Sequence, residues 1–295
     1  MNWMTMKELL DSAYEQYNTS YLSMDPLELV RRYQDPMDQE VAAFLAAAMA
    51  LGQYRLIRNA LDHLLSLMGR SPYQFVLKYH ADLDSELFGS FVYRFYRGDD
   101  IQLLIHWMQK IYVKWGSLEN LFLQGFHQDD VHIGPALSAF VRFILSQEIP
   151  SFFEGLLPRG KGIRHFLSSP EDGSACKRLN LFLRWVVRHD TLDLGIWRRV
   201  PPSMLIIPVD THISRISRQL GLTKRKTADW VMAEEITKSL RMLNPSDPVR
   251  YDFALCTIGK LVNCPAGRQK GSCKDCPINS QCVSVKEEQL DGKSK

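Results

Sequence analysis

The chain has 295 residues, of which 45% are hydrophobic and 23% are charged, as is typical of a soluble globular protein. Its formal net charge of +3 is mildly basic and does not by itself indicate a nucleic-acid partner. A chain of this length is expected to form about two domains. We find no signal peptide and no apolar run long enough to span a bilayer, so we expect a cytoplasmic protein with no membrane partner.

Apolar residues recur at helical spacing along the sequence, and no stretch alternates polar and apolar residues as a half-buried strand does. We therefore predict an all-α protein. The first helices are expected at 6–17, 27–33, 38–53, 55–68, 71–80, 99–115, 118–123, 134–146 and 162–167. The aromatic segment 88–96, whose rings are interleaved with Arg94 and Arg97, is interpreted as part of the core, with base stacking as the alternative.

A strongly amphipathic helix is predicted after the turn formers at 170–174. Its core-facing residues follow helical spacing and are Leu179, Phe182, Leu183, Val186 and Val187. Lys177 is expected one turn into this helix and on another side, with Leu181, Arg184 and Arg188. Lys177 is therefore either an ordinary solvated lysine or an amine that acts as a nucleophile.

Asp210 follows a long connection, 189–202, and an apolar run, and it precedes a helix that ends near Gly221. This position predicts an N-cap, whose carboxylate accepts backbone N–H bonds at the positive end of the helix dipole. Both interactions favour the ionised carboxylate. Asp210 is either a cap alone or also the charged partner of Lys177, and such a pair suits cleavage of a base from damaged DNA. Further helices are predicted at 227–242 and 247–262.

Basic residues outnumber acidic ones around this pair, as a phosphate-binding surface requires. A solvated charged face is the alternative interpretation. The basic residues are Arg159, Lys161, Arg164, Lys177, Arg178, Arg184, Arg188, Arg198 and Arg199.

Four of the six cysteines lie close together near the C-terminus, at Cys264, Cys273, Cys276 and Cys282. Thiolates at short spacings bind metals, because closing the loops between them costs little entropy. One compact loop with four thiolates favours a [4Fe-4S] cluster, and zinc is the alternative. Such a cluster either presents nearby cations to a phosphate backbone or only anchors the C-terminus. Cys176 and Cys256 fall in apolar stripes and are expected to be core residues.

Three features resemble the helix-hairpin-helix DNA glycosylase superfamily. They are the motif Val209-Asp210-Thr211-His212, the cysteine loop, and a hairpin region that ends in Lys177. The chain is similar to endonuclease III over most of its length and closer still to an uncharacterised bacterial family of that superfamily. It departs from the pattern at Ala175, where the family has a second glycine, and at Glu171-Asp172, where it has Leu-Pro. The separation of Lys177 and Asp210 is longer than in endonuclease III and resembles that of archaeal 8-oxoguanine glycosylases, so the segment 190–200 is expected to loop out.

The resemblance implies a two-domain base-excision repair enzyme, expected as a monomer near the nucleoid, that acts on double-stranded DNA with a damaged base. A helical barrel-like domain would span 38–188, and 1–37 with 189–295 would form the domain that holds the cluster. Lys177 would form a Schiff base and give AP lyase activity, and Asp210 would be the catalytic aspartate. The implied DNA contacts are Gln53, Gly173, Ser174, Ala175, Arg178 and His212. The alternatives are a monofunctional glycosylase, in which Asp210 activates water, and a non-catalytic DNA-binding iron–sulfur protein.

Overall fold

A computed structural model describes residues 3–17, 25–81, 83–84, 86–150, 153, 162–261 and 276–283. The elements in these residues are α1 (Trp3–Tyr17), α2 (Leu27–Val30), α3 (Pro36–Met49), α4 (Tyr54–Met68), α5 (Pro72–Lys78), β1 (Val92–Tyr93), β2 (Tyr96–Arg97), α6 (Gly98–Trp115), α7 (Leu118–Phe122), α8 (Gly134–Leu145), α9 (Gly162–Phe166), α10 (Lys177–Val187), α11 (Thr211–Gln219), α12 (Trp230–Arg241) and α13 (Asp252–Leu261). The described chain is mostly helical, as the sequence predicts.

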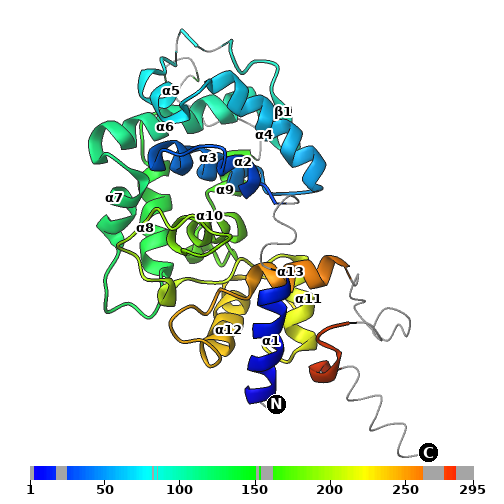
Figure 1. Ribbon diagram of the computed structural model, residues 1–295. Coiled ribbons are helices and arrows are strands. Elements are labelled where there is room, and N and C mark those ends of the chain that lie inside the picture. Colours follow the sequence, from blue (N-terminus) through cyan, green and yellow to red (C-terminus); the bar gives the residue numbers. More distant parts are fainter. Residues whose placement is uncertain are drawn as a thin grey trace, which may run out of the picture.

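The helices gather in two groups (Figure 1). The helices α2 to α10 lie in the upper part of the view, and α1, α11, α12 and α13 lie in the lower part. Because α13 packs against both α1 and α11, the N-terminal helix joins the C-terminal third of the chain. The helix α2 packs against α3 and α4 instead. The domain limits drawn from the sequence stay a prediction.

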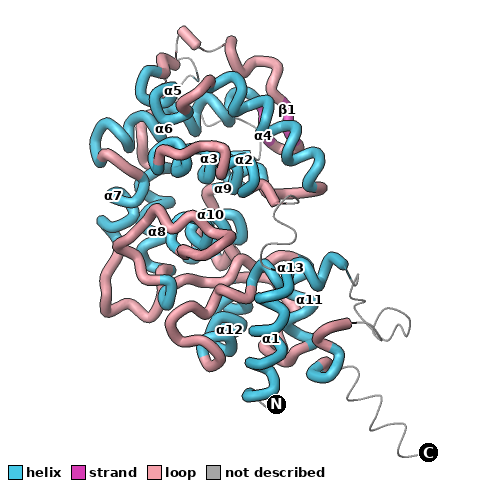
Figure 2. Tube along the Cα trace, in the orientation of Figure 1, coloured by secondary structure: helices cyan, strands magenta, loops and turns pink. Residues whose placement is uncertain are grey.

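A short β-hairpin interrupts the helical chain between α5 and α6 (Figure 2). Its strands are antiparallel, with Val92 opposite Arg97 and Tyr93 opposite Tyr96. Arg94 in the turn has a φ of 52°, which lies in the left-handed region. The prediction of an all-α chain missed this hairpin, because two-residue strands are too short to show an alternating pattern.

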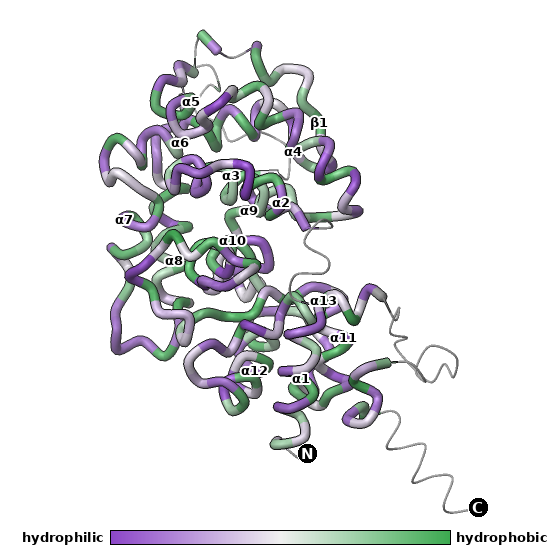
Figure 3. Tube along the Cα trace, viewed as in Figure 1, coloured by the Kyte–Doolittle hydropathy of each residue, from purple (hydrophilic) through white to green (hydrophobic). Residues whose placement is uncertain are grey.

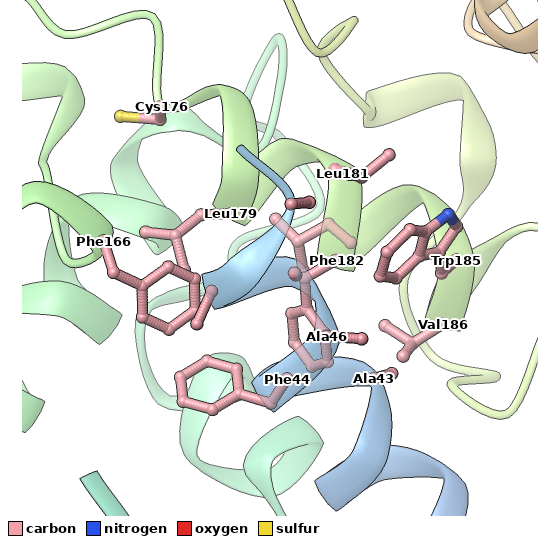
Figure 4. Packing of buried hydrophobic residues seen from close by; sticks show 14 of the residues in the cluster. Ala43, Phe44, Ala46, Phe166, Cys176, Leu179, Leu181, Phe182, Trp185 and Val186 are labelled. Carbon is pink, nitrogen blue, oxygen red and sulfur yellow. The ribbon is translucent and has the colours of Figure 1, made fainter. Parts of the chain in front are cut away.

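The core between α3 and α10 is built from interlocking aromatic rings (Figure 4). The ring of Phe44 on α3 meets those of Phe166 and Phe182 edge-on, at centroid distances of 4.9 and 5.2 Å. Such edge-on pairs stabilise a core beyond the area they bury. Ala43 and Ala46 lie on the same helix, and their small side chains allow α3 and α10 to approach closely. This packing fixes the direction in which α10 runs, and therefore where its first residue, Lys177, lies.

The connection between α10 and α11 is packed into the fold, which corrects the expectation that it loops out. Leu192, Trp197 and Val200 are all buried. The Trp197 indole N–H donates to the buried carboxylate of Glu40 on α3, at 2.6 Å. The same carboxylate accepts the backbone N–H of Leu118 at the start of α7, at 2.9 Å. Glu40 therefore joins α3, α7 and this connection.

Two arginines assigned from the sequence to a phosphate-binding surface lie inside the protein. The side chains of Arg184 and Arg188, on α10, are only 2% and 3% exposed. Arg184 pairs with Asp252 on α13, and both arginines pair with the fully buried Asp193 in the connection. Arg188 also binds both carboxylate oxygens of Asp247, at 3.0 Å. Their charges are neutralised internally and are not offered to a ligand, which corrects the prediction.

Removal of Asp193 is expected to destabilise the fold strongly. In Asp193→Ala two buried guanidinium groups lose a carboxylate, which costs about 3–5 kcal/mol when a buried pair is broken. Urea unfolding followed by circular dichroism measures the loss. The matched control is Glu171→Ala, because Glu171 pairs with Arg142 at 2.6 Å but both side chains are more than half exposed. An exposed pair contributes about 1 kcal/mol or less. Equal losses in the two variants would contradict this account of the network.

Individual helices alternate hydrophobic and hydrophilic residues along the trace, as α4 shows (Figure 3). This helix buries Ile57, Leu61 and Leu64 and exposes Arg55 and Arg58. No helix in the described ranges combines the length and the apolar character needed to cross a bilayer.

Candidate functional site

Asp210 is the N-cap of α11, as the sequence predicts. Its Oδ1 accepts the backbone N–H groups of His212 and Ile213, at 2.8 and 2.9 Å. The apolar run before it is buried from Met204 to Val209, so the approach to the cap is fixed by the core. Asp210 itself is only half-buried. Its second oxygen, Oδ2, therefore has a fixed position from which it can act on a bound group.

Lys177 is the first residue of α10, not a residue one turn into the helix as predicted. The preceding residue, Cys176, has a left-handed φ of 46° and ends the turn from which the helix starts. The Lys177 amine is half-buried and donates to the carbonyl oxygen of Ala50, at 2.9 Å. The remaining sides of α10 are buried, including Leu181 and Arg184. Lys177 is thus held at the end of a helix whose direction the core determines.

Lys177 and Asp210 both influence the pKa values of side chains on one face of α13. Burial raises the pKa of Asp252 to about 6 against the pull of Arg184, and Asp210 adds to this rise while Lys177 opposes it. Burial likewise raises the pKa of the Cys256 thiol to about 12, Asp210 again adds to the rise, and Lys177 again opposes it. Lys177 and Asp210, which are distant in sequence, are therefore both electrostatic neighbours of Asp252 and Cys256.

The close contact between α11 and α13 keeps this arrangement compact. Gly259 on α13 faces His212, and a Cβ at this glycine would lie 3.0 Å from the Cβ of His212. His212 is half-buried, and its Nδ1 lies 3.3 Å from the guanidinium of Arg215. Lys260, one turn beyond Cys256, is a further electrostatic neighbour of Asp210 and Cys256. Burial lowers its pKa, but Cys256, Asp25 and Asp210 outweigh burial and leave that pKa raised.

Gln53 lies at the end of the loop that holds Lys177. This loop runs from Ala50, whose carbonyl accepts the Lys177 amine, to Gln53, the N-cap of α4. The Gln53 side chain is exposed and makes no capping hydrogen bond. The Tyr93 hydroxyl donates to the carbonyl of Leu51 at 2.7 Å and so ties the β-hairpin to the same loop. The Lys177 amine and Gln53, an implied DNA contact, are thereby held by one loop.

The turn of the β-hairpin holds two residues of the aromatic segment for which the sequence left base stacking open. Arg94 lies beside Gly52, where a Cβ would come within 2.8 Å of its guanidinium. Phe95 is 39% exposed, and the Arg94 guanidinium lies 5.9 Å from the centre of its ring. The neighbouring Tyr93 and Tyr96 are buried, so the aromatic segment divides between core and surface.

A backbone hydrogen bond joins the turn before α10 to the start of α12. The backbone N–H of Gly173 donates to Pro170, at 2.9 Å, and its carbonyl accepts the N–H of Trp230, at 3.1 Å. The N–H of Cys176 donates to the hydroxyl of Ser174, at 3.1 Å. The N–H groups of Gly173 and Cys176 are thus engaged within the protein. Phosphate binding by Gly173, Ser174 and Ala175 stays a prediction.

Arg178 is buried and hydrogen-bonded within the protein, which corrects its assignment as a DNA contact. It is 5% exposed. Its Nη1 donates to the carbonyl of Ala48, at 2.8 Å, and to the hydroxyl of Tyr96, at 2.6 Å. Its guanidinium also lies over the ring of Phe166, at 5.5 Å from the centroid. Arg178 therefore joins α10 to the end of α3 and to the β-hairpin.

The cysteine loop is described only in part. Cys264 and Cys273 lie outside the described residues, and Cys276 and Cys282 flank a short 3-10 turn, Asn279–Gln281. Both described thiols are half-buried, and the Cys282 sulfur lies 3.4 Å from the side-chain oxygen of Gln219 on α11. The described ranges hold no group of three or more His, Cys, Asp or Glu side chains arranged for a metal. Two thiols a short turn apart nevertheless fit the donor chemistry of an iron–sulfur or zinc site.

A family model described as "Protein of unknown function (DUF2400)" matches residues 25–261. The match covers most of the 295 residues, and the chain belongs to this family. The matched region contains Gln53, Lys177, Asp210 and all of α13, and it ends before Cys264. No protein in a search of curated sequences matches the chain.

Proposed function

We propose that this member of the DUF2400 family is a DNA glycosylase with lyase activity, acting on a damaged base that is flipped out of the duplex. The observation that carries the proposal is the shared electrostatic environment of Lys177 and Asp210 beside Asp252 and Cys256. An amine and a fixed carboxylate that act on the same site are the groups needed to displace a base from a sugar.

Lys177 is the nucleophile in this proposal. Its amine first leaves the Ala50 carbonyl and loses a proton. Its nitrogen then forms a bond to C1′ of the sugar as the glycosidic bond breaks, and the base departs with the bonding electron pair and takes up a proton. Opening of the sugar ring leaves a Schiff base between C1′ and Lys177. Loss of a C2′ proton from that Schiff base expels the 3′ phosphate by β-elimination and nicks the strand.

Asp210 supplies the negative charge. Its Oδ1 is held by two backbone N–H groups, which leaves Oδ2 to stabilise positive charge developing on the sugar or to accept the proton of the nucleophile. A carboxylate fixed in advance is effective because no reorganisation is needed during the reaction.

The surface around the Ala50–Gln53 loop carries side chains that would contact the DNA duplex in this proposal. Flipping a base costs roughly a few kcal/mol, which contacts with the vacated stack offset. The exposed Gln53 lies on the loop that holds Lys177. Arg94 lies beside Gly52 of the same loop, and its guanidinium is 5.9 Å from the centre of the exposed Phe95 ring. These are the side-chain types that bind phosphate and stack on bases.

The proposal includes a [4Fe-4S] cluster held by Cys264, Cys273, Cys276 and Cys282, with zinc as the alternative. When bound, the cluster would cross-link the C-terminal segment through four metal–thiolate bonds. No chemical step is assigned to it. The Cys282 sulfur lies against Gln219, so the segment would be anchored at the C-terminal end of α11, the helix whose N-cap is Asp210.

Substitution of one cluster ligand is expected to remove the cluster. Anaerobically purified wild type should contain about four irons and absorb visible light, and Cys276→Ser should lose both. Cys256→Ser is the control, because Cys256 lies on α13 and not in the cysteine loop, and it should retain both. Stoichiometric zinc without visible absorption would identify the alternative metal site, and neither metal in wild type would contradict both.

Borohydride trapping tests the enzyme proposal. Wild-type protein is incubated with duplexes that carry oxidised, alkylated or deaminated bases, and borohydride is added to reduce any Schiff base to a stable cross-link. A cross-linked species with at least one duplex is the expected result. Absence of both trapping and base release across the whole panel would overturn the proposal.

A monofunctional glycosylase is the second candidate. The hydrogen bond from Lys177 to the Ala50 carbonyl favours it, since an amine that keeps this bond cannot attack the sugar. Asp210 would then activate water. Base release without strand nicking or trapping would identify this reaction. Binding of damaged DNA that is unchanged in Asp210→Asn, with no base release by wild type, would instead indicate a non-catalytic DNA-binding protein.

A further inference from the structure

The helix α13 presents three polar residues at successive turns. Asp252, Cys256 and Lys260 are each four residues apart and therefore share one face of the helix. Asp252 is fixed by Arg184, through a hydrogen bond of 2.5 Å in the buried network. Cys256, the middle residue, faces Asp210. Its sequence context predicted a core residue, but the side chain is half-buried and lies beside a carboxylate.

The two oxygens of Asp210 have different partners. Oδ1 is occupied by the backbone N–H groups of His212 and Ile213. The Cys256 sulfur lies 3.8 Å from Oδ2, in position to donate its hydrogen. The backbone bonds fix one end of the carboxylate, and the thiol can fix its rotation about that end. The close packing of Gly259 on His212 holds α13 at the distance this contact needs.

A thiol placed here acts as a donor because it keeps its proton. Burial raises the pKa of Cys256 to about 12, and Asp210 adds to the rise, while Lys260 and Lys177 oppose it. The charged groups that face this pair come from three helices: Lys177 from α10, Asp210 from α11, and Asp252 and Lys260 from α13. A protonated thiol beside a carboxylate donates to it and does not compete with Lys177 as a nucleophile.

We infer that Cys256 is a positioning residue for Asp210, whose second carboxylate oxygen it holds toward the reacting sugar through an S–H donor. The inference rests on the proposed function for its role in catalysis, but the contact itself does not depend on activity. A neutral hydrogen-bond donor at this place stabilises the carboxylate and adds no second charge that would compete with the developing positive charge on the sugar.

Infrared spectroscopy tests the contact without any substrate. The difference spectrum of wild type minus Cys256→Ser isolates the S–H stretching band of Cys256 from those of the other thiols. The same difference is then measured in the Asp210→Asn background, where the charged acceptor is lost and the amide still caps the helix. We expect the band to shift to higher frequency when the acceptor loses its charge. A band at the same frequency in both backgrounds would overturn the inference.

Enzyme kinetics test the role in catalysis. Cys256→Val keeps the volume and removes the donor, whereas Cys256→Ser keeps a donor. A typical hydrogen bond contributes about 0.5–1.5 kcal/mol, so the valine variant should excise the base roughly threefold to tenfold more slowly. Its acidic limb in the pH–rate profile should move to higher pH, because the charged carboxylate has lost a donor. The serine variant should restore both the rate and the limb.

The outcomes separate the inference from the proposed function. If Cys256→Val and Cys256→Ser both showed the wild-type rate and the wild-type acidic limb of the pH–rate profile, the inference would be overturned. The proposed function would stand. No activity in wild type, together with the expected infrared shift, would overturn the proposed function and keep the contact between Cys256 and Asp210. Thermal unfolding of each variant shows whether a slower rate reflects loss of fold, and unchanged stability with the displaced limb confirms the positioning role.

Discussion

Lys177→Ala is expected to abolish borohydride trapping and to reduce strand nicking by at least about a hundredfold. The variant removes the amine that would form the Schiff base, and no other group in the proposed mechanism can replace it. The half-buried Lys177 amine donates to the Ala50 carbonyl and is not part of the buried ion-pair network, so its loss should leave the fold intact. Trapping is measured by gel shift after reduction, on the lesion to which wild type cross-links best.

Lys260→Ala is the matched control, because Lys260 is a second amine among the electrostatic neighbours of Asp210 and Cys256. It should still cross-link. Cross-linking by Lys177→Ala at the wild-type rate would remove Lys177 from the mechanism. Loss of trapping only in Lys260→Ala would assign the nucleophile to α13.

Asp210→Asn is expected to lower the single-turnover rate of base release by about 10²–10⁴-fold, the contribution typical of a positioned acid–base group. Asparagine accepts backbone N–H bonds as an N-cap nearly as well as aspartate, so the start of α11 should be preserved. The variant therefore removes the charge and keeps the geometry. Rapid-quench measurement under excess enzyme gives the rate directly.

The contribution of Asp210 to the stability of the fold is measured separately with Asp210→Ala. Alanine removes the cap and should cost about 1 kcal/mol of stability, whereas asparagine should cost much less. A catalytic loss in Asp210→Asn without a loss of stability would assign the effect to charge. Full activity in Asp210→Asn would contradict a catalytic role, and equal destabilisation of both variants would contradict the cap.

The N-cap at Asp210 could be predicted because its determinants are local. An apolar run, a proline, an acidic residue and a helical pattern follow one another within a few residues, and the structure shows the two backbone hydrogen bonds that this pattern implies. The starting point of α10 was predicted less well. Its helical pattern is clear, but the left-handed turn at Cys176, which sets the first residue, has no signature in residue type.

The surface assignment of Arg184 and Arg188 failed because a count of charges does not show which of them pair inside the fold, whether the partner is near in sequence, as Asp193 is, or distant, as Asp252 is. Charge excess was counted over a local window, whereas Asp247 and Asp252 lie on or near α13, far from α10 along the chain. Arg178 was misplaced for a similar reason, since its acceptors on α3 and the β-hairpin are visible only after folding. Charge patterns along a sequence do not distinguish a cation that binds a ligand from one that is neutralised internally.

Cys256 was missed because its neighbours in sequence are apolar. The periodicity of α13 marks it as a core position, but α11 begins directly opposite and places Asp210 beside it. The long connection before Asp210 was misjudged for the opposite reason. It looked like an inserted loop, yet Leu192 and Trp197 bury it against the rest of the chain.

The most direct test of the account is to identify the amino acid that carries the reduced cross-link. Wild-type protein is trapped on its best lesion, digested with protease and nuclease, and the modified peptide is sequenced by mass spectrometry. The account predicts a sugar remnant on the side-chain nitrogen of Lys177. A remnant on another residue, or no cross-link in a protein that releases the base and nicks the strand, would contradict it.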